Sequence, residues 1–262
     1  MSSLFISEVP IYIILDTNWL IYLSKGQHPY VLQKIREKII EGKFVLLVPE
    51  IIRAEYFQNE EKPIRQLEDL IEKEYDSVRA LSEHMNSNDK EIILKLLNKY
   101  AESSDKRLEI ARQRLESIKE LISMHSKLIP TSSNARELAI MHSLQKQAPM
   151  HKKNSFSDAL IFFSAYDYFV KKHDPALKNI IFVTNNHEDF SDTKDKDVIH
   201  PDLKGYLDKI GMYYERNIAR AFKLSKSIEQ HIEKMVYKEW EDFFTHENAK
   251  QAALGPDGVG II

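Results

Sequence analysis

Residues 11–23, IYIILDTNWLIYL, decide the fold class of this chain. The five apolar residues Ile11 to Leu15 predict a strand that is buried on both faces, as in a parallel sheet covered by helices. The run stops at Asp16, and a helical pattern begins directly after it. Because ligands bind at the carboxyl ends of parallel strands, Asp16 is well placed for chemistry. The alternative is that Asp16 only caps the helix that follows.

The composition limits the class of protein. The 262 residues suffice for one large domain or two small ones, and 43% of them are apolar, which supports a substantial core. The absence of cysteine excludes disulfides and thiolate metal sites, and it favours a reducing compartment. With no signal-peptide pattern and no apolar run of membrane-spanning length, we expect a cytoplasmic protein without a membrane partner. The net charge of -3 gives no overall attraction to nucleic acid, so such binding requires local patches.

Strand and helix patterns alternate along both ends of the chain. A helix over residues 29–40 leads to a second apolar run at 44–48, and Pro49 then opens another helix. Further strands are predicted at 179–183 and, as a short edge strand, at 212–214. This order predicts an α/β fold with a central, mostly parallel sheet flanked by helices.

Residues 62–126 have a different character. Charged residues dominate, and apolar ones recur at three- and four-residue steps, which predicts two long amphipathic helices forming a hairpin with its turn at 84–89. The charges are of both signs and favour a solvated surface over a nucleic-acid patch. We expect a single domain over 1–262, with this hairpin inserted at about 62–128 and a C-terminal helical extension at about 215–246.

Acids and amides stand at several strand ends and helix starts. They lie after the first strand, on the helix after the second, at the start of the helix before the third, and after the third strand: Asp16, Glu55, Asp158, and Asn186 with Asp189. Carboxylates gathered at one sheet edge would repel one another, and a bound divalent cation relieves that repulsion. Ligands that are all oxygen favour Mg²⁺ or Mn²⁺ over Zn²⁺.

Simpler interpretations exist for each acid. Glu55 could be a surface acid, and Glu50 in the same helix could be mistaken for it. Asp158 could cap its helix, a role that neighbouring serines could also fill. Asp189 could be a turn residue.

The segments LDTNWLI, PEIIRAEY, FSDALI and FVTNNHEDF resemble the four ordered motifs of PIN-domain nucleases, which include the VapC-type toxins of bacterial toxin–antitoxin pairs. The resemblance covers about residues 10–60 and 150–215 and leaves the helical hairpin unmatched. The Asn-x-x-Asp-Phe stretch with a following His-Pro-Asp-Leu is similar to larger bacterial PIN-like proteins. The resemblance implies a PIN-like fold and a nuclease activity that depends on Mg²⁺ or Mn²⁺.

Carried over by position, the resemblance assigns roles to individual residues. Metal binding is implied for Asp16, Glu55 and Asp158, and the positioning of carboxylates and water for Asn18 and Thr184. The family often has a fourth acid where this chain has Asn186. Asn186 could still contribute to catalysis through its carbonyl or by holding a water, with Asp189 reaching in as a metal ligand. This departure affects the binding of a second metal and the turnover rate more than the activity itself.

Basic residues near these motifs could hold phosphates. Lys152 and Lys153, with His151, precede Asp158, and His187 follows the third strand. A solvent-facing histidine is the alternative for His187.

The function expected from the resemblance is endonucleolytic hydrolysis of RNA, in which a metal-held water attacks the phosphodiester. The resemblance also implies a toxin or phage-defence setting and an antitoxin or other protein partner. A homodimer could use the apolar segments at 213–214 or 240–244, for which the core interpretation is preferred. Three alternatives remain open. They are a scaffold that binds RNA or a partner without cleaving, a phosphatase of the haloacid-dehalogenase kind with Asp16 as nucleophile, and a hairpin that is itself the working surface.

Overall fold

The computed structural model of the protein describes residues 9–24, 29–152, 155–170 and 174–254. Its elements follow one another in the order β1 Ile11–Leu15, α1 Thr17–Ser24, α2 Pro29–Ile40, β2 Phe44–Pro49, α3 Glu50–Asn59, α4 Lys62–Ser82, α5 Ser87–Met124, β3 Ser126–Ile129, α6 Ser133–Leu144, α7 Phe156–Val170, the 3-10 turn η1 Pro175–Leu177, β4 Ile180–Val183, α8 His187–Phe190, α9 Pro201–Ile210, β5 Met212–Glu215 and α10 Ile218–Leu254.

Five strands form one sheet in the order β3-β2-β1-β4-β5, and every neighbouring pair is parallel. The α/β prediction is therefore confirmed, and the parallel pairing extends to all five strands. The apolar runs of β1 and β4 are almost entirely buried, as strands covered on both faces require. The sequence did not indicate β3, because only Ile129 of its four residues is buried and no apolar run marks it.

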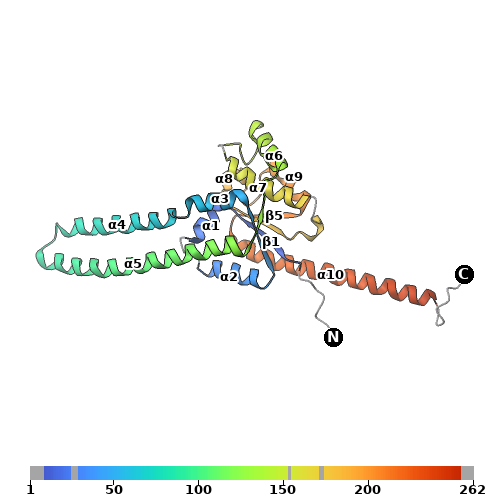
Figure 1. The fold of residues 1–262 in the computed structure, drawn as a ribbon, viewed down its shortest axis with the longest axis horizontal. Helices are drawn as coiled ribbons and strands as arrows, with labels where there is room; N and C mark the ends of the chain where they lie inside the picture. The colour runs from blue at the N-terminus through green and yellow to red at the C-terminus, as the bar shows by residue number, and fades with distance from the viewer. Residues whose placement is uncertain (1–8, 25–28, 153–154, 171–173, 255–262) are drawn as a thin grey trace.

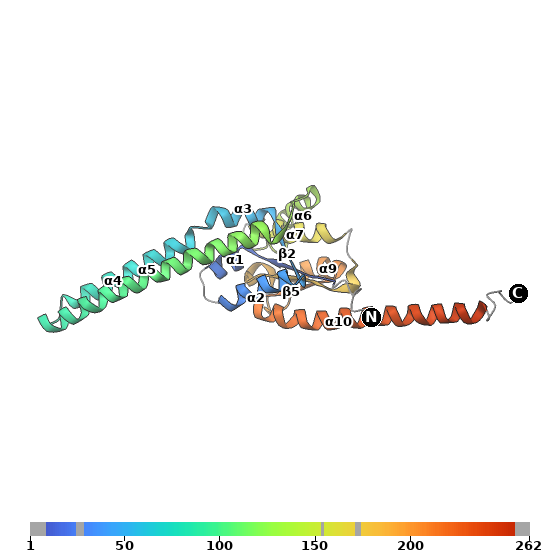
Figure 2. The same cartoon turned by 60° about the horizontal axis from the view of Figure 1, so that its bottom comes forward.

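Helices cover both faces of the sheet. On one face α7 contacts β2 and β3 while α9 contacts β5, and on the other α2 contacts β2 while α10 contacts β1, β4 and β5. Figures 1 and 2 show α7 and α9 on one side of the strands and α2 and α10 on the other. Because these helices cover the two faces, the carboxyl edge of the sheet is formed by the segments that follow the strands.

The predicted helical hairpin is confirmed. Helices α4 and α5 pack against each other and project from the sheet, while α10 extends in the opposite direction (Figures 1 and 2). Asn86 begins α5 by accepting a hydrogen bond from the backbone N–H of Asp89 at 3.0 Å. At the base of the hairpin a small apolar cluster forms around Ile64, Ala111 and Leu115. Beside this cluster the two helices also form exposed ion pairs such as Arg112–Glu68 at 3.3 Å, as expected for a solvated surface.

Two other expectations concern the C-terminal part of the chain. Tyr213 and Tyr214 are half-buried and pack against the core, which supports the core interpretation of that segment. The side chains of Trp240, Phe243 and Phe244 lie outside the part that the structure describes. Among the described residues, none of the helices combines the length and the hydropathy needed to cross a membrane.

An aromatic cluster joins α7 to the sheet beneath the carboxyl edge. Phe162 is fully buried, and its ring centroid lies 5.8 Å from that of Phe182 on β4 and 6.1 Å from that of Phe190 on α8. The rings of Phe182 and Phe190 also meet, at 5.2 Å. This cluster fixes α7 and α8, which both carry candidate site residues, relative to β4.

We expect Phe162→Ala to lower the free energy of unfolding by about 3–5 kcal/mol, because it removes a buried ring and leaves a cavity. Urea denaturation followed by circular dichroism measures this loss. Leu144→Ala is the control, since Leu144 is 80% exposed and its truncation should change stability by less than about 0.5 kcal/mol. Equal losses in the two variants would contradict the role given to the aromatic cluster.

Candidate functional site

The register of β1 and β4 brings two polar side chains together at the carboxyl edge of the sheet. Leu15 lies opposite Val183 in the parallel ladder, so the residues that follow, Asp16 and Thr184, meet just beyond the strand ends. The Thr184 hydroxyl donates a hydrogen bond to Oδ2 of Asp16, and both side chains are buried. This point lies between the two strands where the strand order reverses, which is where open parallel sheets bind ligands.

Asp16 also caps the helix that follows it. Its Oδ1 accepts a hydrogen bond from the backbone N–H of Trp19 at 2.8 Å, which is the geometry of a helix N-cap. Capping occupies only one of the two carboxylate oxygens. Burial raises the pKa of Asp16 from 3.8 to about 6; hydrogen bonds from Thr184 and Trp19 oppose this rise, and the charge of Glu55 adds to it. The negative charge of Asp16 is thus costly in this environment and would be stabilised by a cation.

Glu55 reaches the same edge from α3. The hydroxyl of Thr17, the residue after Asp16, donates a 2.6 Å hydrogen bond to Oε2 of half-buried Glu55. Glu50 on the same helix is exposed, and its Oε2 accepts a hydrogen bond from the backbone N–H of Thr131 at 3.1 Å. The two acids therefore point in different directions, and Glu55 is the one that lies beside Asp16.

A second group of acids is held together by Asn186. Its Nδ2 donates to Oδ2 of Asp158 at 2.9 Å and to Oδ2 of Asp189 at 2.7 Å. A carboxylate can only accept hydrogen bonds, so the amide nitrogen rather than the amide oxygen faces both acids. Ser155 adds a 2.7 Å hydrogen bond to the same oxygen of Asp189, which is fully buried. In this arrangement Asn186 supplies donors where a fourth acid would add charge.

Thr184 joins the two groups. Its Oγ1 accepts a hydrogen bond from the backbone N–H of Asn186 at 3.0 Å while donating to Asp16. A continuous set of hydrogen bonds thus runs from Asp16 through Thr184 and Asn186 to Asp158. The hydrogen bond between Asp16 and Thr184 alone joins residues that are 168 positions apart in the sequence.

Glu55 and Asp158 face one cavity. It has a volume of about 420 Å³ and is lined largely by polar side chains, namely Thr17, Asn18, Ile21, Glu55, Asn59, Lys62, Ser155, Phe156, Ser157 and Asp158. Asn18 is exposed on its wall. Asn59 and Lys62 are not among the site residues expected from the sequence. Their spacing from Glu55, four and seven residues, was a usable signal, because it places all three on one face of a helical segment.

The donor set suits a hydrated divalent cation better than a closed cage. Within the described ranges, no three His, Asp or Glu side chains converge closely enough to hold a metal ion. Two carboxylates, on α3 and α7, do face the same polar cavity, and buried Asp16 directly precedes Thr17, one of its lining residues. Mg²⁺ is commonly bound by one or two carboxylates and keeps several waters, so these residues fit such an ion.

The basic residues expected to hold phosphates lie away from the acidic cavity where the structure describes them. Lys152 is exposed, and Lys153 lies outside the described residues. His187 is half-buried at the start of α8, and its Nδ1 lies 3.3 Å from the carbonyl oxygen of Asn185. His151 instead packs against His200, with ring centroids 4.8 Å apart. Of the described ones, neither Lys152 nor either histidine is among the residues that line the cavity with Glu55 and Asp158.

Taken together, the sheet and its open edge define an α/β protein with an acidic site at the carboxyl ends of β1 and β4. Residues 13–190, more than half of the chain, match the family model of the PIN domain, and the chain belongs to the PIN-domain family. Neither the curated proteins nor the solved structures gave a match. PIN domains are typically nucleases that act on nucleic acid and generally use divalent metal ions.

We expect Asn186→Asp to make the stability of the protein depend on divalent cations. The change removes two donated hydrogen bonds and places a third carboxylate beside Asp158 and Asp189. In EDTA its Tm should fall by about 5 °C relative to wild type, and Mn²⁺ should raise the Tm of the variant more than that of wild type. Differential scanning calorimetry measures both shifts.

Asn185→Asp is the matched control, because it adds the same charge at the exposed neighbouring position. Its Tm in EDTA should stay close to that of wild type. An Asn186→Asp protein that melts like wild type with and without Mn²⁺ would show that the amide does not balance the charge of these acids.

Proposed function

We propose that this protein is a metal-dependent endoribonuclease that hydrolyses RNA phosphodiester bonds with Mg²⁺ or Mn²⁺. The observation that carries the proposal is the cavity shared by Glu55 and Asp158 beside buried Asp16. Asp16 directly follows β1, and Glu55 on α3 and Asp158 on α7 line the cavity at the same edge of a parallel sheet, in a protein of the PIN-domain family. Metal-dependent phosphodiester hydrolysis uses such acids, since they bind the cation that activates water and offsets charge on the phosphate.

The acids have distinct parts in this proposal. Glu55 and Asp158 would hold the ion directly, and Asp16 would add the third carboxylate, with Asp189 as a further ligand. When bound, the ion supplies Lewis acidity toward a phosphate oxygen and lowers the pKa of water. Thr184 and the backbone of Trp19 fix the Asp16 carboxylate, so that its charge would contribute to holding the ion.

Neutral residues around the acids would orient them. Asn186 fixes Asp158 through its amide, and Thr17 fixes Glu55 through its hydroxyl. In the proposed reaction Asn186 would act on the catalytic water or the acids rather than carry a charge, and Asn18 on the cavity wall would hold water or substrate. We propose that Lys152, Lys153 and His187 contact phosphates of the bound RNA that lie outside the cavity.

The biological setting is part of the proposal and rests on the resemblance to toxin ribonucleases. It comprises RNA as the substrate, a toxin or phage-defence role in the cytoplasm, and an antitoxin, another protein or a second copy of the chain as partner. A cytoplasmic enzyme of this kind needs a partner or a specific substrate to limit its damage to cellular RNA. Association with an antitoxin would be detected by co-purification with the product of a neighbouring gene.

One observation favours a second candidate function, a PIN-like scaffold that binds RNA or a partner with little or no cleavage. Asn186 stands where the family often has an acid, and its amide nitrogen already faces Asp158 and Asp189. An amide at this place reduces the charge available for a second cation. Such a scaffold would bind Mn²⁺ and RNA without producing fragments.

We expect the wild-type protein to cleave a mixed RNA pool in Mn²⁺ or Mg²⁺ and to leave it intact in EDTA. Asp16→Asn and Glu55→Gln should each lower the rate by about a hundredfold or more, because each removes charge that holds the cation. Gel electrophoresis of end-labelled RNA, with matched single-stranded DNA run in parallel, measures the rates and the preference for RNA.

Glu50→Gln is the control for this experiment, because it removes an acid from the same helix that points away from the cavity. Its cleavage rate should equal that of wild type. Cleavage that survives unchanged in Asp16→Asn would place the activity elsewhere and overturn the proposal. An intact RNA pool together with Mn²⁺ binding by calorimetry would favour the scaffold.

A further inference from the structure

A lysine lies on the wall of the acidic cavity and comes from the helical hairpin. Lys62 is the first residue of α4, and it lines the cavity together with Glu55 and Asp158. The two residues that connect α3 to α4, Glu60 and Glu61, keep right-handed helical backbone angles. Glu55, Asn59 and Lys62 therefore fall at positions i, i+4 and i+7 of a nearly continuous helical path, and all three line the cavity.

The backbone that carries Lys62 is firmly anchored. Pro63 and Ile64, the next two residues, are buried, and Ile64 belongs to the apolar cluster at the base of the hairpin. On the preceding side, Glu60 forms an ion pair with Lys119 of α5 at 3.3 Å. The exposed side chain of Lys62 consequently extends from a fixed base and can adjust its ammonium group to a ligand in the cavity.

The charges in this cavity are suited to a cation and an anion bound together. Glu55 and Asp158 attract a divalent cation, whereas the ammonium group of Lys62 would be repelled by that cation unless an anion lay between them. A phosphodiester supplies such an anion, since its oxygens can contact the cation on one side and a lysine on the other. Thr17, Asn18 and Ser157 add neutral hydrogen-bonding groups on the same wall.

We propose that Lys62 positions the substrate by binding a backbone phosphate of the nucleic-acid strand at the cavity. The hairpin thereby contributes to the site through its first residue rather than through its distal surface. This inference rests on the proposed nuclease function and names the group that holds the phosphate. Lys62 acts on substrate binding and contributes little to the chemical step.

The test compares Lys62→Ala and Lys62→Arg with wild type. In Mn²⁺, Lys62→Ala should raise KM for single-stranded RNA by roughly tenfold, the size of one charge-assisted hydrogen bond, with kcat changed less than twofold. In Ca²⁺, with the RNA checked for integrity on a gel, its Kd by fluorescence anisotropy should rise by a similar factor. The slope of log Kd against log salt should decrease by about 0.7, as expected for one lost phosphate contact. Lys62→Arg should restore KM, Kd and the slope.

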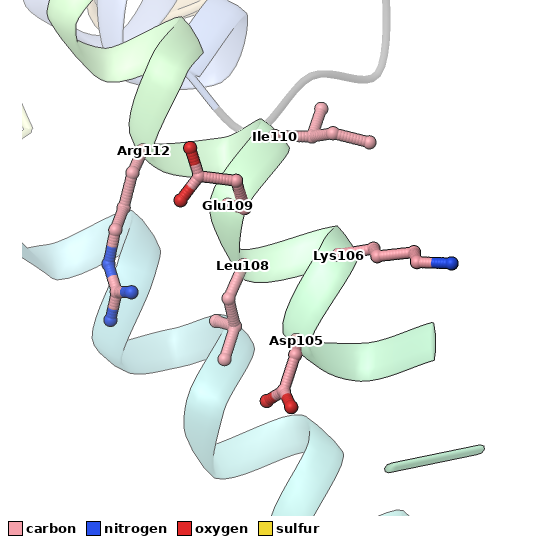
Figure 3. A pocket seen from close by; sticks show the side chains of 6 residues that line it. All are labelled: Asp105, Lys106, Leu108, Glu109, Ile110 and Arg112. Atoms are coloured by element: carbon pink, nitrogen blue, oxygen red, sulfur yellow. The ribbon is translucent and has the colours of Figure 1, made fainter. Parts of the chain in front are cut away.

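Lys106→Ala controls for a general loss of positive charge on the hairpin. Figure 3 shows Lys106 on α5 pointing away from α4, in a pocket that it shares with Asp105, Leu108, Glu109, Ile110 and Arg112. This residue does not line the acidic cavity. Its replacement should leave KM, Kd and the salt slope unchanged, and circular dichroism should show that every variant is folded.

Each outcome decides the inference. Wild-type cleavage with an unaltered KM, Kd and salt slope in Lys62→Ala would overturn it and leave the nuclease proposal intact. Equal weakening by Lys62→Ala and Lys106→Ala would also overturn it, in favour of diffuse attraction. Binding without cleavage in wild type, weakened only by Lys62→Ala, would reject the nuclease proposal and support Lys62 as a phosphate-binding residue. Wild-type protein that neither binds nor cleaves would overturn both.

Discussion

The hydrogen bond from the Thr184 hydroxyl to Asp16 is the contact on which the rest of the site depends. It forms because the β1–β4 register sets Leu15 opposite Val183, so that the two residues after the strands face each other. The same hydroxyl accepts the backbone N–H of Asn186, which sets the start of α8 and aims the Asn186 amide at Asp158. The Thr184 side chain thus links the carboxyl ends of β1 and β4 to the start of α8, the helix that carries Asp189.

Neutral donors hold each acid of the site. Thr17 donates to Glu55, Ser155 to Asp189 and Asn186 to both Asp158 and Asp189. Hydroxyl and amide donors fix the geometry of a carboxylate without neutralising its charge, so the negative potential of the cavity is preserved for a cation. The raised pKa of Asp16 reflects the same condition, because burial there penalises its charge by more than the hydrogen bonds from Thr184 and Trp19 offset.

Prediction from the sequence succeeded where a single element carries the signal. The apolar runs of β1, β2 and β4 marked the sheet, and the three- and four-residue apolar spacing marked the hairpin. Strand β3 escaped because a four-residue edge strand with one buried side chain has no periodic pattern to detect. Lys62 escaped for another reason. Its seven-residue spacing from Glu55 places it on the same face only if the helical backbone continues through Glu60 and Glu61. The structure shows that these two residues do keep helical angles.

The sequence by itself determined the fold class, the strand ends at which acids occur and the oxygen-rich character of the donors, because these follow from local hydrophobic pattern and residue type. Only the tertiary structure decided how the acids are grouped. It paired Asp16 with Thr184, directed Glu55 rather than Glu50 to the edge, and placed the Asn186 amide between Asp158 and Asp189. The physical reason is that strand register and helix packing set distances between residues far apart in the chain, and local patterns contain no information about those distances.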